Sequence, residues 1–268
     1  MIQFHVYPGG KKRILTFSYD DGHEFDLRLI ELFNRYGMKA TFHLNDRPHL
    51  LRGETEEEAI LHFRNAYAGH EISCHTSSHG WPSRMPASSV IEETRTNRLT
   101  LEHLAGYPIV GMSYPSGSYN AEVEEIMRYA GIVYSRTTKS TLGFALPDDF
   151  LAWHPSCHHR DADALADKFL ANIDSQWTSP LFYIWGHAHE FRTEEDWKTM
   201  EELLKKLAFN DKIWYATNIE IHDYMCAQKL LRISADEKII QNPTATDVWI
   251  EKDKTQIIRI PAGETVTL

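Results

Sequence analysis

The chain has 268 residues, 42% of them hydrophobic, and a net charge of −10, which suits one large globular domain or two small ones. The acidic balance excludes a typical nucleic-acid-binding protein, because no basic stripe is present to neutralise phosphates. The three cysteines give no disulfide framework, and no apolar run is long enough to span a membrane. The N-terminus has no basic segment followed by an apolar core, so we expect a cytoplasmic protein without a signal peptide.

Apolar runs that are typical of buried strands alternate along the chain with segments of helical periodicity. The predicted strands lie at 14–19, 39–44, 71–75, 109–114, 132–135, 181–185 and 213–216. The predicted helices lie at 24–36, 55–69, 89–104, 120–129, 161–173, 193–207 and 218–231. Helices of this length between strands act as crossovers, so the alternation predicts a parallel sheet.

Seven strand–helix units form either an open doubly wound sheet or a barrel. Candidate functional residues lie at or just after the C-terminal ends of different strands, and a barrel brings those ends around one mouth. They are Asp20, Asp21, His75, Pro115, His187 and Thr217. We therefore predict an α/β fold, a distorted (β/α)7 barrel over residues 1–231. The remaining residues, 232–268, contain short alternating apolar runs and predict a small C-terminal β appendage packed on the barrel.

The pair Asp20-Asp21 follows the first predicted strand, and two such carboxylates repel each other unless a positive charge lies beside them. His75 and His79 are four residues apart and can point at one ion. Two histidines and one carboxylate form a catalytic rather than a structural metal pattern. A divalent metal, zinc in the first place with cobalt, nickel or iron as alternatives, would lower the pKa of a bound water. Asp20 could then accept the proton of that water, and His187 is placed to protonate the leaving group.

These segments resemble the motifs of the polysaccharide deacetylase family, the NodB-homology carbohydrate esterases. Its Thr-Phe-Asp-Asp-Gly motif is similar to Ser-Tyr-Asp-Asp-Gly at 18–22, and its His-Ser/Thr-x-x-His motif is matched at 75–79. Its Arg-x-Pro-Tyr-Gly motif is matched in part at 113–119, and its Leu-x-His motif loosely at 184–187. The resemblance covers about residues 12 to 225 in the order of the family.

The resemblance implies a distorted seven-unit barrel and hydrolysis of acetyl groups from N-acetylated or O-acetylated sugars. It also implies Asp20 as general base, His187 as general acid and a metal bound by Asp21, His75 and His79. The oxyanion would be held by the metal and a backbone N–H near Tyr114. We expect contacts with an acetylated sugar or small-molecule substrate from Tyr114, Pro115, Trp153, His158 and Trp185.

Departures from the family pattern keep alternatives open. Ser113 stands where the family has an arginine that steadies the base, and the family's Asp with a Trp that positions the acid histidine has no clear match. His189 is an alternative acid to His187. The favoured function is deacetylation of an N-acetylated sugar or glycan. The alternatives are hydrolysis of a cyclic amide or ureide, and carbohydrate binding by a protein that has lost catalysis.

Overall fold

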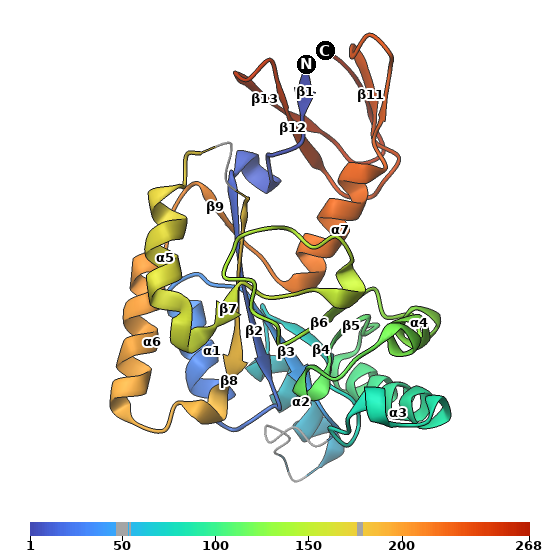
Figure 1. Cartoon of the computed structure of the whole chain (residues 1–268), viewed down its shortest axis with the longest axis vertical. Coiled ribbons are helices and arrows are strands. Elements are labelled where there is room, and N and C mark those ends of the chain that lie inside the picture. The colour runs from blue at the N-terminus through green and yellow to red at the C-terminus, as the bar shows by residue number, and fades with distance from the viewer. Residues whose placement is uncertain (47–52, 54, 176–178) are drawn as a thin grey trace.

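The computed structural model describes residues 1–268 except 47–52, 54 and 176–178 (Figure 1). Its main sheet is parallel and curled, with the strand order β6-β5-β4-β3-β2-β8-β7 and β9 paired with the beginning of β2. The predicted α/β fold with a distorted barrel is thereby confirmed. The strands of this sheet are β2 (Arg13–Asp20), β3 (Ala40–Leu44), β4 (Glu71–Cys74), β5 (Gly111–Ser113), β6 (Tyr134–Arg136), β7 (Cys157–His158), β8 (Leu181–His187) and β9 (Ile213–Tyr215).

Helices cover the outside of the curled sheet, with α1, α5 and α6 gathered on one side and α3 and α4 on the other (Figure 1). Thr55 caps its helix through a capping box with Glu58, whereas the helix predicted from Ser89 begins earlier, directly after Pro86. The helices are α1 (Asp26–Arg35), α2 (Glu56–Ala66), α3 (Ala87–Ala105), α4 (Ala121–Tyr129), α5 (Ala162–Ala171), α6 (Glu194–Leu207) and α7 (Asn218–Lys229).

One strand of the sheet lies between the predicted strand 132–135 and the predicted helix 161–173, where no strand is predicted. Cys157 and His158 form β7 and pair in parallel with Ile184 and Trp185 of β8. A strand of two residues is too short to show an alternating pattern, so the sequence gives no periodic signal for it. The strand places His158 beside the end of β8.

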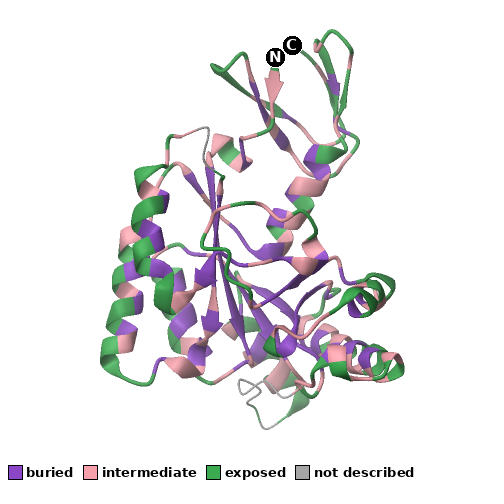
Figure 2. Cartoon of the chain, in the orientation of Figure 1, coloured by how far each residue is buried: buried purple, intermediate pink, exposed green. Residues whose placement is uncertain are grey.

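The central strand β2 is buried along all eight residues, which Figure 2 shows as a purple strand through the middle of the fold. Successive side chains of a strand point to opposite faces. Leu15, Phe17 and Tyr19 therefore pack in the main core, while Ile14 joins a second cluster with Tyr183. Asp20 lies in the same alternating row as Ile14, at the far end of the strand.

The appendage is built from both ends of the chain and contains two three-stranded antiparallel sheets around Ile240, Ile250 and Ile260. The strand order is β1-β12-β13 in one sheet and β10-β11-β14 in the other. The appendage lies beyond the end of the barrel where β2 begins (Figure 1), whereas Asp20 is the last residue of β2. Its strands are β1 (Ile2–Gln3), β10 (Arg232–Ile233), β11 (Ile239–Gln241), β12 (Val248–Lys252), β13 (Gln256–Ile260) and β14 (Thr265–Thr267).

Candidate active site

The predicted metal ligands lie in turns that directly follow strands β2 and β4. Asp21, Thr76 and His79 have positive φ angles of 78°, 59° and 58°. Non-glycine residues adopt this left-handed conformation rarely, at a cost of about 1–3 kcal/mol each, and such residues cluster at functional sites. The two turns hold these side chains in place against that cost.

The side chains of Asp21, His75 and His79 converge on one point, with their ligand-type atoms all within 4.8 Å of one another. The Nε2 atoms of His75 and His79 lie 3.5 Å and 3.6 Å from Asp21 Oδ1. Nδ1 of His75 lies 3.0 Å from the Ser113 carbonyl oxygen, to which it donates in the tautomer that leaves Nε2 with a lone pair. Metal-binding histidines are typically oriented in this way.

His75 Nε2 is the atom that tests whether a cation fits here. It is buried and has no hydrogen-bond partner within the described residues. A buried polar atom without a partner costs about 1–3 kcal/mol, and a cation beside Asp21 would remove that cost. Two imidazole nitrogens and one carboxylate are a donor set suited to zinc and to its neighbours among the transition metals. The residues present therefore fit a divalent cation.

Asp20 lies beside this group, buried at 2% exposure. Its Oδ1 accepts a hydrogen bond from the Ser113 hydroxyl at 3.1 Å, and its Oδ2 accepts one from the guanidinium of Arg136. Burial alone would raise the pKa of Asp20, but the charge of Arg136 and the nearby histidines outweigh it and hold the pKa well below its usual range. Asp20 is therefore a carboxylate across the neutral pH range.

Arg136 supplies the cation that the sequence lacks at position 113. It ends β6, and in the β5–β6 pairing it is the direct register partner of Ser113. Its side chain is fully buried, and its guanidinium lies 4.5 Å from the centre of the Trp185 ring. Sequence analysis missed this residue, although an arginine directly after the predicted buried strand 132–135 was a signal for it.

His187 ends β8 and is the register partner of Asp20, with its Nε2 4.0 Å from Asp20 Oδ2. Its Nδ1 lies 3.6 Å from Glu190 Oε2. Burial would lower the pKa of His187, but the interaction with Glu190 and the negative charges of Asp20 and Asp21 raise it above its ordinary value. The position and charge of His187 therefore suit a proton donor.

His189, the alternative acid, points to a different carboxylate. Its Nδ1 lies 3.7 Å from Asp21 Oδ2. Burial and the neighbouring His187 lower the pKa of His189, so its imidazole is the more neutral of the two. This difference favours His187 as the acid.

Glu190 is the second residue that sequence analysis missed. Its carboxylate lies 2.9 Å from His158 Nε2, 3.4 Å from His159 Nε2 and 3.1 Å from Arg160. Burial would raise the pKa of Glu190, but these partners and His187 hold it far below its usual range. Oε2 of Glu190 also lies 3.6 Å from Nδ1 of His187, three residues earlier in the chain, so three histidines surround this carboxylate.

The predicted substrate contacts fall into two groups. His158 and Trp185 lie beside His187, with the Trp185 ring 4.9 Å from His158 and 5.5 Å from His187. Tyr114, Pro115 and Trp153 are all buried.

The burial of Tyr114 and Trp153 has a clear physical basis. The Trp153 ring has no exposed surface and packs edge-on against Tyr134 and Tyr183, so we assign it to the core. The N–H of Tyr114 donates to the Arg136 carbonyl at 2.9 Å, which engages that amide in the sheet. Its hydroxyl donates to the Leu151 carbonyl at 2.9 Å. Both polar groups of Tyr114 that could donate to a substrate are therefore engaged within the protein.

The family model for polysaccharide deacetylase matches residues 8–135. The matched segment contains Asp20, Asp21, His75 and His79 and ends one residue before Arg136. A comparison with curated protein sequences gives no match.

Several solved structures share the fold. A Mycobacterium smegmatis protein assigned to the polysaccharide deacetylases is 17% identical, with 86% of this chain and 96% of that chain covered and a TM-score of 0.60. The Xyl-CE4 domain of a multidomain xylanase from the hindgut metagenome of Trinervitermes trinervoides is 16% identical, with 80% and 92% covered and a TM-score of 0.55. A CE4 family pseudoenzyme from Bacillus anthracis is 17% identical, with 82% and 68% covered and a TM-score of 0.51.

At these identities the structural likeness establishes the fold, and the family model supplies the sequence evidence over the first half of the chain. No helix in the described part of the chain is long and apolar enough to cross a membrane. The resemblance to the polysaccharide deacetylase family, first seen in the motifs at 18–22 and 75–79, is therefore confirmed.

Proposed function

We propose that this chain is a metal-dependent hydrolase that removes acetyl groups from N-acetylated sugars or glycans. One observation carries the proposal: Asp20 and His187 flank the convergent atoms of Asp21, His75 and His79. The base and the acid are register partners on adjacent strands, so both face the same point. The acetylated substrate and the cytoplasmic location stay predictions from the sequence.

A divalent cation, zinc in the first place with cobalt, nickel or iron as alternatives, would supply Lewis acidity at Asp21, His75 and His79. Asp20 accepts a proton from the attacking water. Arg136 and the Ser113 hydroxyl fix the carboxylate of Asp20 and keep it charged. A carboxylate with so low a pKa is a weak base, so the water that it deprotonates must itself have a lowered pKa.

His187 acts at the other side of the scissile bond. The raised pKa of His187 favours the protonated imidazole, which can donate a proton to the departing amine. Glu190 lies beside Nδ1 and leaves Nε2 directed toward Asp20. His158 and Trp185 are the predicted substrate contacts that we retain, because both lie next to His187.

Arg136 also bears on the choice between functions. The absence of an arginine at position 113 was one reason to consider a cyclic amide or ureide as substrate. Arg136, on β6 beside the strand that carries Ser113, makes the ion pair with Asp20 instead. The missing arginine at position 113 therefore no longer favours a cyclic amide or ureide as substrate. The Bacillus anthracis pseudoenzyme is a reminder that the fold alone does not guarantee catalysis, so the test must measure turnover.

The experiment is an assay of acetate release from N-acetylglucosamine oligomers by metal-loaded protein, run beside an assay of ring opening of cyclic amides. Asp20→Asn removes the base, and Asp167→Asn, an exposed aspartate on α5, is the matched control. We expect acetate release by the wild type and the control and its loss in Asp20→Asn. Metal-loaded wild type that releases no acetate from any acetylated substrate would overturn the proposal.

A further inference from the structure

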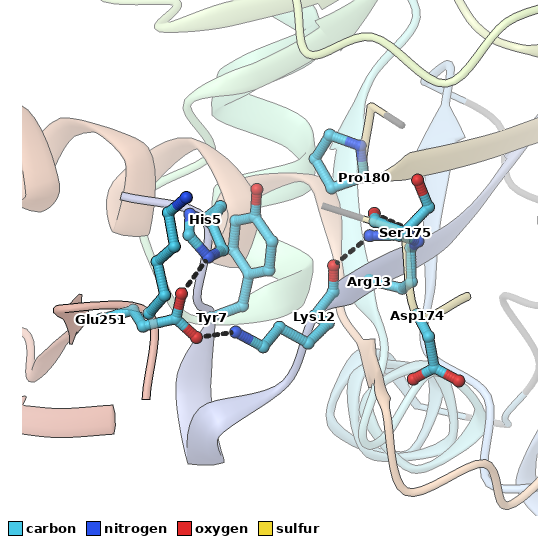
Figure 3. A pocket seen from close by; sticks show the side chains of 9 residues that line it. His5, Tyr7, Lys12, Arg13, Asp174, Ser175, Pro180 and Glu251 are labelled. Carbon is cyan, nitrogen blue, oxygen red and sulfur yellow. Dashed lines mark hydrogen bonds and ion pairs between the residues drawn. The ribbon is translucent and has the colours of Figure 1, made fainter. Parts of the chain in front are cut away.

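A cavity of about 240 Å³ lies where the barrel meets the appendage (Figure 3). Arg13, the first residue of β2, lines it, whereas Asp20 is the last residue of that strand, so the cavity and Asp20 lie at opposite ends of β2. His5 and Tyr7 line it from the segment before β2, and Arg13 from the first residue of β2. Glu251 and Lys254 line it from β12 and the turn that follows. The cavity is therefore built jointly by the barrel and the appendage.

The charges around this cavity are more positive than the acidic chain leads one to expect. Lys12, Arg13 and Lys254 face two carboxylates, Glu251 and Asp174, in a chain with a net charge of −10. Both carboxylates are already engaged.

Glu251 is bound by Lys12 at 2.6 Å and lies 2.8 Å from His5, as Figure 3 shows. Both carboxylate oxygens of Asp174 accept hydrogen bonds from Lys212, which lies outside the cavity, at 2.6 Å and 2.7 Å. Within the described residues, Arg13 and Lys254 have no carboxylate in ion-pair contact.

Arg13 is a buried cation in the cavity wall, at 4% exposure, and Glu251 is also buried. Its guanidinium donates to the carbonyl oxygens of Lys12 at 2.9 Å and Ser175 at 2.6 Å and to that of Asn172. Its Nε–H is buried without a partner in the described part of the chain. Carbonyl dipoles compensate a buried cation only in part, so a negative charge beside Arg13 would be stabilising.

Tyr7 adds a second donor to the same cavity. Its side chain is 2% exposed and its ring stacks on Trp214, which fixes the direction of the hydroxyl. That hydroxyl has no hydrogen-bond partner among the described residues. A neutral donor, a buried guanidinium and a lysine from the appendage together form a set suited to oxyanions.

We propose that this cavity binds a small oxyanion, a phosphate or carboxylate group carried by a small molecule, with Arg13, Tyr7 and Lys254 as its donors. Because Arg13 belongs to the barrel and Lys254 to the appendage, the bound anion links the two. Binding therefore stabilises the folded chain without any contact with the site around Asp20.

The test is calorimetric titration of the full-length protein with inorganic phosphate and, separately, with succinate, at constant ionic strength. The variants are Lys254→Ala and Tyr7→Phe, which keeps the aromatic ring. Lys238→Ala is the matched control, because Lys238 is an exposed appendage lysine outside the cavity. His75→Ala distinguishes this cavity from anion binding at the metal site.

We expect one of the two anions to bind the wild type, Lys238→Ala and His75→Ala equally, and to bind Lys254→Ala about tenfold more weakly, since a charged hydrogen bond contributes about that much. Tyr7→Phe weakens binding by a smaller factor. Equal affinity in Lys254→Ala and Lys238→Ala, loss of binding in His75→Ala alone, or no binding of either anion would overturn the proposal. None of these outcomes depends on deacetylase activity.

Discussion

Two groups of histidines and carboxylates lie near His187, and they differ in what their polar atoms already contact. In the metal group, Asp21, His75 and His79, the buried Nε2 of His75 has no hydrogen-bond partner in the described chain. In the Glu190 group, His158, His159 and Glu190, one carboxylate is shared by both histidines and by Arg160. Residue types alone would make either group a metal site.

The state of the donors separates the two groups. A cation in the metal group would bind the buried Nε2 of His75, which otherwise has no partner in the described chain. A cation in the Glu190 group would compete with Arg160 for the carboxylate of Glu190. We therefore propose that the metal group binds the cation and that the Glu190 group orients His187. The predictions below test this division of roles.

The largest effect is expected for the base beside the metal group. Asp20→Asn keeps the size of the side chain but removes its ability to accept a proton, so kcat falls by about 10²–10⁴-fold. Steady-state acetate release measures this loss, and metal analysis of the same sample is its control. Full activity in Asp20→Asn would contradict the assignment of the base.

Arg136 is expected to have the next largest effect, because its loss leaves Asp20 buried without its strongest partner. In Arg136→Ser, burial raises the pKa of Asp20, so the acid limb of the pH–rate profile moves to higher pH. We expect kcat at neutral pH to fall by about 100-fold.

The exchange Ser113→Arg with Arg136→Ser sharpens this test, since the two positions are register partners. The double variant returns the guanidinium to the position that the family uses and should recover part of the lost activity. A double variant with no more activity than Arg136→Ser, although equally stable by thermal unfolding, would show that the arginine does more than pair with Asp20.

Glu190→Gln tests the role of the second group. The carboxylate raises the pKa of His187, so its replacement by a neutral amide lowers that pKa and moves the alkaline limb of kcat/KM to lower pH. At pH 8 we expect kcat/KM about tenfold below that of the wild type, as for other residues that orient a catalytic histidine. An unchanged alkaline limb would mean that Glu190 does not orient the acid.

The smallest effect is expected for Arg160, whose side chain is 66% exposed where it meets Glu190. An exposed ion pair contributes about 0–1 kcal/mol, so Arg160→Gln should change kcat/KM by less than about fivefold. The measurement is the same acetate assay. If the variant instead acquires a second bound metal, the arginine was what kept the Glu190 group free of cations.

The parts of the site that could be predicted from sequence are those set by local spacing. Asp20 and Asp21 follow a mostly apolar run, and His75 and His79 are four residues apart after the next predicted strand but one, so their meeting required a parallel sheet. Arg136 and Glu190 could not be assigned in this way. Arg136 depends on the order and register of β5 and β6, and Glu190 on the direction of the turn after β8.

The same limit explains the placement of Trp153 and of β7. Trp153 lies in a segment without periodicity, which gives no sign of whether its ring faces the mouth or the core. The structure places it in the core because the neighbouring aromatics Tyr134, Phe150 and Tyr183 enclose it. Tertiary packing decides such positions.

The most direct test of the account is metal content per chain after equilibration with zinc, measured for the wild type, His75→Ala and His158→Ala. We predict one tightly bound ion in the wild type, one in His158→Ala and none in His75→Ala, because, of the two groups in the described chain, the metal group is the one with a buried nitrogen that has no partner. Retention of the ion in His75→Ala together with its loss in His158→Ala would contradict the account.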